Sequence, residues 1–214
     1  MLQMSFGNYA IAKDWRSEKL MADGARNVHR SSPFVCSWRK RQLLEAYRGE
    51  IPAGCRVLDV GCGSGAIGKA VVDTFQAKVE GADIVNLLVH DLPFHILPDS
   101  WKKWPEQAFD VIMINDALHH MEPETQLFTL RQALRVGRKV LIFETHPTVL
   151  AKVADVVMGY FIYGGREAVP LTHRDPEIWC RILEELGCRV NRRDVLKPSF
   201  FYPLRHFAIT AERL

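Results

Sequence analysis

Short apolar runs alternate with segments of helical spacing along the middle of the chain. Runs that are apolar at consecutive positions are typical of parallel strands covered by helices on both faces. Five of these runs are predicted to be strands: Arg56–Val60, Lys78–Ala82, Pro93–Leu97, Asp110–Ile114 and Lys139–Phe143. The alternation of strands and helices predicts an α/β fold around a largely parallel sheet.

Segments with apolar residues at helical spacing complete this pattern. The predicted helices span residues 35–47, 66–75, 127–134 and 176–186. Gly187 is well placed to end the last helix. Two final runs, Arg189–Val195 and His206–Ala211, have no helix between them. An antiparallel hairpin at the end of the sheet is therefore expected, which brings the sheet to about seven strands.

The composition is that of a globular chain. Of the 214 residues, 48% are hydrophobic and 25% charged, and the formal net charge is +3. So small a charge argues against a protein dedicated to nucleic acid or to an acidic membrane surface. The five cysteines form no CxxC pair, so neither a disulfide framework nor a metal site is predicted. Free thiols, and no signal-peptide or membrane-spanning pattern, favour a cytoplasmic protein.

A glycine-rich segment follows the first predicted strand and precedes a helix. It reads Val57-Leu58-Asp59-Val60-Gly61-Cys62-Gly63-Ser64-Gly65. Glycines allow a tight turn and allow a ligand to lie against the backbone. Residues 63–68 also match the dinucleotide pattern GxGxxG. Asp59 argues against that interpretation, because its carboxylate would repel a pyrophosphate and would attract an ammonium group.

The segment resembles the first motif of class I S-adenosylmethionine (SAM) dependent methyltransferases. The family pattern is an acid, any residue and three alternating glycines, which here are Asp59, Gly61, Gly63 and Gly65. The resemblance covers roughly residues 34–214, is nearest the small-molecule branch of type 11-like enzymes, and implies a Rossmann-like doubly wound sheet. It also implies SAM as cofactor and S-adenosylhomocysteine as product.

The resemblance further assigns cofactor contacts along the chain. Asp83, at the end of the second strand, would hold the ribose hydroxyls, and its place about 20 residues beyond the loop suits that role. The adenine-side acid is either Asp99 or Asp91, and Asp99 is preferred because it follows the third strand. The remaining contacts implied are Cys62, Ile84, Ser100 and Asn115. Trp101 either stacks on the adenine or packs against the sheet edge.

The segment Phe109–Met121 resembles the fourth-strand motif of the same branch, with its Leu-His-His sequence. A base is needed only where the acceptor must lose a proton, and histidine is the natural candidate near neutral pH. His120 and His146 are the first candidates, followed by His119 and Glu144. His173 also falls near the predicted carboxyl edge of the sheet.

The whole chain, 1–214, is expected to be one methyltransferase domain. Its predicted parts are a helical arm or lid at 1–50, a SAM-binding core at 51–146, a substrate cover at 147–172, and a closing helix and hairpin at 173–214. Tyr9, Trp15 and the aromatic residues at 160–163 are predicted to border the substrate, with a dimer contact as the alternative for the latter. Gly164-Gly165 is a possible hinge.

The function predicted is methyl transfer to an oxygen, nitrogen or carbon atom of a small molecule, such as a secondary metabolite. No nucleic acid partner and no membrane span are expected, and a homodimer is possible. Two alternatives stay open. One is a SAM-binding regulatory or scaffold protein without transferase activity, and the other is an NAD-dependent oxidoreductase that uses residues 63–68.

Overall fold

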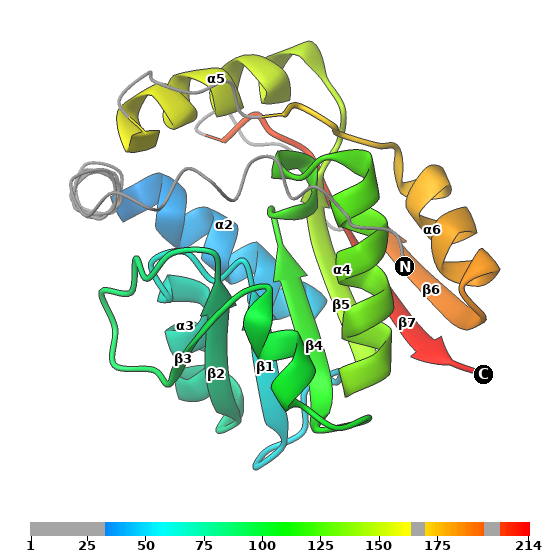
Figure 1. Cartoon of the computed structure of the whole chain (residues 1–214). Helices are drawn as coiled ribbons and strands as arrows, with labels where there is room; N and C mark the ends of the chain where they lie inside the picture. Colours follow the sequence, from blue (N-terminus) through cyan, green and yellow to red (C-terminus); the bar gives the residue numbers. More distant parts are fainter. Residues whose placement is uncertain (1–32, 164–169, 195–201) are drawn as a thin grey trace.

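A seven-stranded mixed sheet forms the centre of the structure (Figure 1). The computed structural model describes residues 33–163, 170–194 and 202–214. Its strands are β1 (Arg56–Val60), β2 (Lys78–Asp83), β3 (Phe94–Ile96), β4 (Phe109–Asn115), β5 (Gly137–Thr145), β6 (Cys188–Asp194) and β7 (His206–Arg213). They are arranged in the order β3-β2-β1-β4-β5-β7-β6.

The first five strands are parallel, and β7 pairs antiparallel with both β5 and β6. This confirms the expected Rossmann-like sheet with an antiparallel C-terminal hairpin. Every strand except β1 differs from its predicted run by one or two residues at one or both ends. β3 is shorter than the run 93–97, and β5 extends to Thr145 because it pairs with β7 as far as His206.

Helices cover both faces of the sheet and its upper edge (Figure 1). They are α2 (Pro33–Ala46), α3 (Ala66–Phe75), α4 (Pro123–Val136), α5 (Val149–Tyr163) and α6 (Pro176–Glu185), with short 3₁₀ turns η2 (Asp99–Lys103) and η3 (Leu118–His120). α4 begins earlier than predicted, with Pro123 in its first turn, where a missing N–H costs nothing. Among the described helices, none is both long and apolar enough to cross a membrane.

Residues 149–163 of the segment predicted as a substrate cover form α5, which was not predicted as a helix. α5 lies across the carboxyl ends of the parallel strands (Figure 1). Ala151 is buried, while Val153, Val156 and Val157 are exposed. Tyr9, Trp15 and Gly164-Gly165 lie outside the described residues, as do the side chains at 160–163. The four-part division of the chain stays a prediction.

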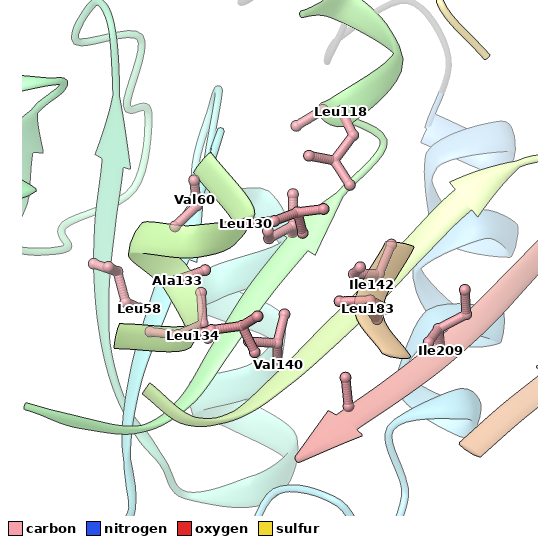
Figure 2. Packing of buried hydrophobic residues seen from close by; sticks show 14 of the residues in the cluster. Leu58, Val60, Leu118, Leu130, Ala133, Leu134, Val140, Ile142, Leu183 and Ile209 are labelled. Atoms are coloured by element: carbon pink, nitrogen blue, oxygen red, sulfur yellow. The ribbon is translucent and has the colours of Figure 1, made fainter. Parts of the chain in front are cut away.

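Two hydrophobic clusters pack against the two faces of the sheet. One holds α4 and α6 against β1, β4, β5 and β7, and Figure 2 shows its packing around Leu130, Leu134 and Ile142. The other holds α2 and α3 against the opposite face, around Leu43 and Val71. The side chains of neighbouring strand residues alternate between these clusters, so both faces of each central strand are apolar.

The burial difference between two isoleucines predicts a difference in stability. Ile142 on β5 is fully buried and Ile178 on α6 is 37% exposed. Ile142→Ala is expected to lower the free energy of unfolding by about 2–5 kcal/mol, because it leaves a cavity in a packed core. The same change at Ile178 is the control and is expected to cost less than about 1 kcal/mol. Urea denaturation measures both, and equal losses would contradict this account of the core.

Candidate active site

The sheet has a topological switch point between β1 and β4. From β1 the chain adds β2 and β3 on one side, then crosses to place β4 and β5 on the other. In open α/β sheets, ligands bind beyond the carboxyl ends of the strands at such a point. Asp59 near the end of β1 and Asn115 at the end of β4 lie there.

The glycine loop begins directly after β1 and leads into α3. Gly61, Gly63 and Gly65 all have positive φ, at +74°, +50° and +75°. A Cβ at Gly61 would lie 2.5 Å from the Cβ of Ala117, whereas a Cβ at Gly63 would meet nothing within 4 Å. Gly61 therefore allows close packing against the segment after β4, while the backbone at Gly63 borders open space in which a ligand can lie.

The Asp59 carboxyl group is buried beside this loop. Its Oδ1 accepts a hydrogen bond from Asn115 Nδ2 at 3.1 Å, and Asn115 Oδ1 accepts one from the Tyr47 hydroxyl at 2.6 Å. Among the described residues its Oδ2 forms no hydrogen bond of good geometry, and it lies beside the backbone of Gly68. Burial raises the pKa of Asp59 to about 7, although the Asn115 hydrogen bond lowers it. A cation placed at Oδ2 would restore the ionised form.

Asp83 ends β2 and connects it to the glycine loop. Its Oδ2 accepts from the Gly63 backbone N–H at 2.9 Å, and its Oδ1 accepts from Ile84 N–H at 2.7 Å. Burial raises the pKa of Asp83, and these two hydrogen bonds oppose the rise. A carboxylate has about four acceptor sites, so each oxygen keeps a lone pair that two neighbouring hydroxyls could use.

The other predicted cofactor residues surround this edge. The Cys62 side chain is buried, a Cβ on Gly81 would lie 2.9 Å from its sulfur, and burial raises the pKa of the thiol. Ile84 is 39% exposed, and Ser100 is buried in η2. Trp101 is buried, and its ring packs edge-on against Trp104 at an interplanar angle of 79°. This agrees with the second of the two predicted roles of Trp101, packing against the protein rather than stacking on the adenine.

The two acids considered for the adenine side differ in position. Asp99 begins η2, three residues after Ile96, which pairs with Asp83 across β3 and β2. Asp91 precedes β3 and is exposed, as Asp99 also is. Asp99 therefore lies beyond the carboxyl end of β3, close to the strand position that pairs with Asp83. Its role beside the adenine stays a prediction.

A second group of polar side chains lies above β4 and β5. Glu144 is buried, and its Oε1 accepts from the backbone N–H groups of Ala117 and Leu118 at 3.1 and 2.8 Å. Its Oε2 lies 2.5 Å from His119 Nδ1. Burial alone would lower the pKa of His119, but the Glu144 carboxylate raises it to about 9.

Three further residues surround His119. The ring of His120 lies 4.1 Å from it between centroids, and the ring of His173 stacks on it at 4.3 Å. Asp155 Oδ2, from α5, is 3.5 Å from His119 Nε2 and 2.8 Å from His173 Nε2. Burial and the neighbouring His119 lower the pKa of His120 to about 4.

An ion pair of Arg39 and Asp116 lies between the residues around Asp59 and those around His119. Arg39 Nε donates to Asp116 Oδ2 at 2.6 Å, and Thr145 Oγ1 donates to Asp116 Oδ1 at 3.1 Å. Burial would raise the pKa of Asp116, but Arg39 and His206 hold it below its ordinary value. His146 lies after β5, where its backbone N–H donates to Arg205 O and its ring packs edge-on against Phe207.

The structure thus brings His119, His120 and Glu144 together, with His146 on the β7 side of β5. Tyr47, Asp116 and Asp155 were not predicted as site residues. Asp116 could have been found from its position, because it directly follows the predicted cofactor contact Asn115. Asp155 could have been noticed as a single acid within an apolar helical run. Tyr47 carried no signal of its own, because a tyrosine on an amphipathic helix is usually a core residue.

The sequence of this chain matches a known family. The family described as "Methyltransferase domain" matches residues 28–192. The chain belongs to the methyltransferase domain family. This membership confirms the resemblance carried by the glycine loop, and S-adenosylmethionine is the cofactor of the site.

Individual relatives of this methyltransferase-family chain are distant. Phosphoethanolamine N-methyltransferase 1 of Arabidopsis thaliana is 34% identical over 101 residues, which are 42% of this chain and 21% of that enzyme. The chain thus matches about a fifth of the length of that relative. A SAM-dependent methyltransferase from Archaeoglobus fulgidus has a similar fold, with a TM-score of 0.64, 18% identity, and coverage of 79% of this chain and 91% of that one.

A third relative was solved with the cofactor bound. It is phosphoethanolamine N-methyltransferase 2 of Haemonchus contortus in complex with SAM, with a TM-score of 0.57 and 15% identity over 81% of this chain and 52% of that one. The site of this methyltransferase-family chain fits such a ligand. The unpartnered Asp59 Oδ2 can accept from the ammonium group, and the open space at Gly63 leaves room beside the loop.

The raised pKa of Asp59 predicts that SAM binding depends on pH. Protonated Asp59 cannot attract an ammonium group, so affinity is expected to fall as pH drops through about 7. Calorimetry at pH 6 and pH 7.5 should show roughly five- to tenfold weaker binding at pH 6. Asp59→Asn should bind weakly at both pH values and lose the dependence. Equal affinities of the unchanged protein at the two pH values would contradict this role.

The contacts of Asp83 predict a difference between two aspartates. Asp83→Ala removes the acceptor of the Gly63 N–H and is expected to weaken SAM binding at least tenfold. Asp91→Ala, at an exposed position before β3, is the matched control and is expected to change affinity less than about twofold. Fluorescence or calorimetric titration measures both. Similar losses in the two variants would show that the assignment after β2 is wrong.

Proposed function

We propose that the chain transfers a methyl group from SAM to an oxygen, nitrogen or carbon atom of a small molecule. The observation that carries the proposal is the buried, half-satisfied Asp59 carboxyl beside an open glycine loop. That arrangement suits a cationic ligand. It opposes a dinucleotide, because the pyrophosphate would lie against an acid. Membership of the methyltransferase family supports the same conclusion.

A small acceptor is supported by charge and by the relatives named for phosphoethanolamine, and one further relative is named as a tRNA U34 carboxymethyltransferase. The net charge of +3 lacks the strong basic excess that phosphate neutralisation requires. Enzymes named for phosphoethanolamine are among the curated relatives, so small amines are the first acceptors to test. The expectations of a cytoplasmic location and of a homodimer stay predictions.

The residues of the site have separable tasks in this proposal. Asp59, oriented by Asn115 and Tyr47, would hold the ammonium group of the cofactor. Asp83 would hold the ribose, and Ile84, Asp99 and Ser100 would border the adenine. The bound sulfonium supplies an activated methyl group, so the protein need only align the acceptor with it and exclude water. α5, above the strand ends, is the element placed to exclude water.

His146 remains as a candidate for proton removal, where the acceptor requires it, because the other two histidines proposed for this step are poorly suited. A general base works best with a pKa near the operating pH. The pKa of His119 is raised to about 9 by Glu144, and that of His120 is lowered to about 4 by burial, so both lie far from neutrality. Glu144 accepts from two backbone N–H groups and lies beside His119 Nδ1, which gives it the contacts of a positioning residue.

Transfer of a labelled methyl group tests the proposed function. The protein is incubated with SAM carrying an isotopic methyl label and with either phosphoethanolamine or a low-molecular-weight metabolite extract. The label is expected in a small molecule, together with S-adenosylhomocysteine. Asp59→Asn should lower the rate at least tenfold, because the ammonium loses its charged partner, while Asp91→Asn serves as control. Saturable SAM binding without transfer to any small molecule would favour the regulatory alternative.

A further inference from the structure

Three possible metal ligands lie close together between η3 and α5. They are His119 and His120 of η3 and Asp155 of α5, and His173 lies beside them, stacked on His119 and 2.8 Å from Asp155. One ligand atom each from His119, His120 and Asp155 lies within 4.8 Å of the other two. The side chain of His119 is 2% exposed and that of His173 is 0% exposed.

Among the described residues, polar atoms of these four side chains have no hydrogen-bond partners. They are His119 Nε2, His120 Nδ1, Asp155 Oδ2 and His173 Nε2. His173 Nε2 and Asp155 Oδ2 lie 2.8 Å apart, yet their geometry is not that of a hydrogen bond. Buried polar atoms without partners are costly, so four in one region need an explanation. A cation bound by His119, His120 and Asp155 would supply the partner that three of these atoms lack.

The surroundings of His119 have the form of a metal-ligand support. A metal-binding histidine usually donates its second ring N–H to a carboxylate, which fixes the ring and its tautomer. Here Glu144 Oε2 lies 2.5 Å from His119 Nδ1, and Glu144 is itself held by the backbone N–H groups of Ala117 and Leu118. His119 Nε2 is thereby left facing Asp155.

We propose that His119, His120 and Asp155 bind one divalent transition-metal ion, and that this ion fastens α5 to the carboxyl edge of the sheet. Two imidazoles and one carboxylate are a donor set that suits Zn²⁺ in tetrahedral coordination with a fourth, non-protein ligand. Bonds of 2.0–2.2 Å place tetrahedral ligand atoms about 3.3 Å apart. The present spacing of 3.5 Å between His119 Nε2 and Asp155 Oδ2 is close to that distance.

Another group of possible ligands lies nearby but is already satisfied. Asp116, His119 and Glu144 also offer atoms within 4.8 Å of one another. Asp116 is paired with Arg39 and accepts from Thr145, and Glu144 accepts from two backbone N–H groups and faces His119 Nδ1. A cation there would have to displace these partners. The unpartnered atoms favour the site at Asp155.

The position of the ligands explains what the ion would do. Thr172 donates from its backbone N–H and from its hydroxyl to His119 O, each at 3.1 Å, so His173 is already tied to η3. Asp155 is the ligand that comes from α5, one turn after the buried Ala151 and on the same inner face. Binding of the ion would therefore join α5 to a segment that hydrogen bonds have already ordered.

Metal titration of untagged protein tests the proposal. After treatment with a chelator, the protein is titrated with Zn²⁺ alone and, separately, with Co²⁺, whose visible absorption reports tetrahedral coordination. One equivalent is expected to bind. Asp155→Asn and His120→Gln should each weaken Zn²⁺ affinity at least tenfold. Glu144→Gln, which leaves the three ligands in place and changes the group beside His119 Nδ1, should weaken it 10- to 100-fold.

His95→Gln is the matched control, because His95 pairs with Glu80 on the edge of the sheet and is not one of the three ligands. It should keep the affinity of the unchanged protein. Hydrogen exchange is the second readout, and Zn²⁺ should slow exchange across residues 149–157 in the unchanged protein but not in Asp155→Asn. Substoichiometric binding, unchanged affinity in the ligand variants, or an equal loss in the control would overturn the proposal.

The metal site and the proposed methyl transfer fail separately. Zn²⁺ binding and hydrogen exchange are measured without SAM or acceptor. If the protein binds Zn²⁺ as expected but does not bind SAM, the proposed function alone is overturned. Failure to bind Zn²⁺ in a protein that binds SAM would overturn the metal site alone.

Discussion

The parallel pairing of β1 with β2 and β4 is the constraint on which the site depends. Parallel strands end at the same edge, so residues distant in the sequence meet there. Asp59 pairs in register with Gly81 and with Met113, which brings the ends of the three strands level. The glycine loop, Asp83 and Asn115 are gathered by this register. The apolar faces of the strands, buried on both sides, hold the register because a slip would expose them.

Buried carboxylates at this edge are neutralised in different ways. Asp116 is paired with Arg39, and Glu144 lies against His119 and two backbone N–H groups. Asp59 has an amide partner for one oxygen and none for the other. An ionised carboxyl in that position costs free energy until a cation arrives. The difference separates Asp59, the acid proposed to bind the ammonium group, from acids whose partners are already present in the fold.

Local sequence patterns predicted most of the fold. The run 56–60 and the helix 66–75 agree with β1 and α3, because apolar periodicity and the glycine turn act over a few residues. α5 was not recognised as a helix, because its run of consecutive apolar residues has no clear period. Trp101 could not be assigned from sequence, since stacking on a ligand and packing on Trp104 need the same residue type.

The sequence by itself determined the glycine loop and most of the order of strands and helices. Asp59, its three glycines and Asp83 were predicted as cofactor contacts because their spacing along the chain resembles the family motif, and that assignment stays a prediction. The tertiary structure alone decided which histidines meet. His173 lies 54 positions after His119, and Asp155 comes from a helix between them, so no local pattern relates them. Their convergence follows from the way α5 and the segment before α6 return to the end of β4, and only the folded chain establishes it.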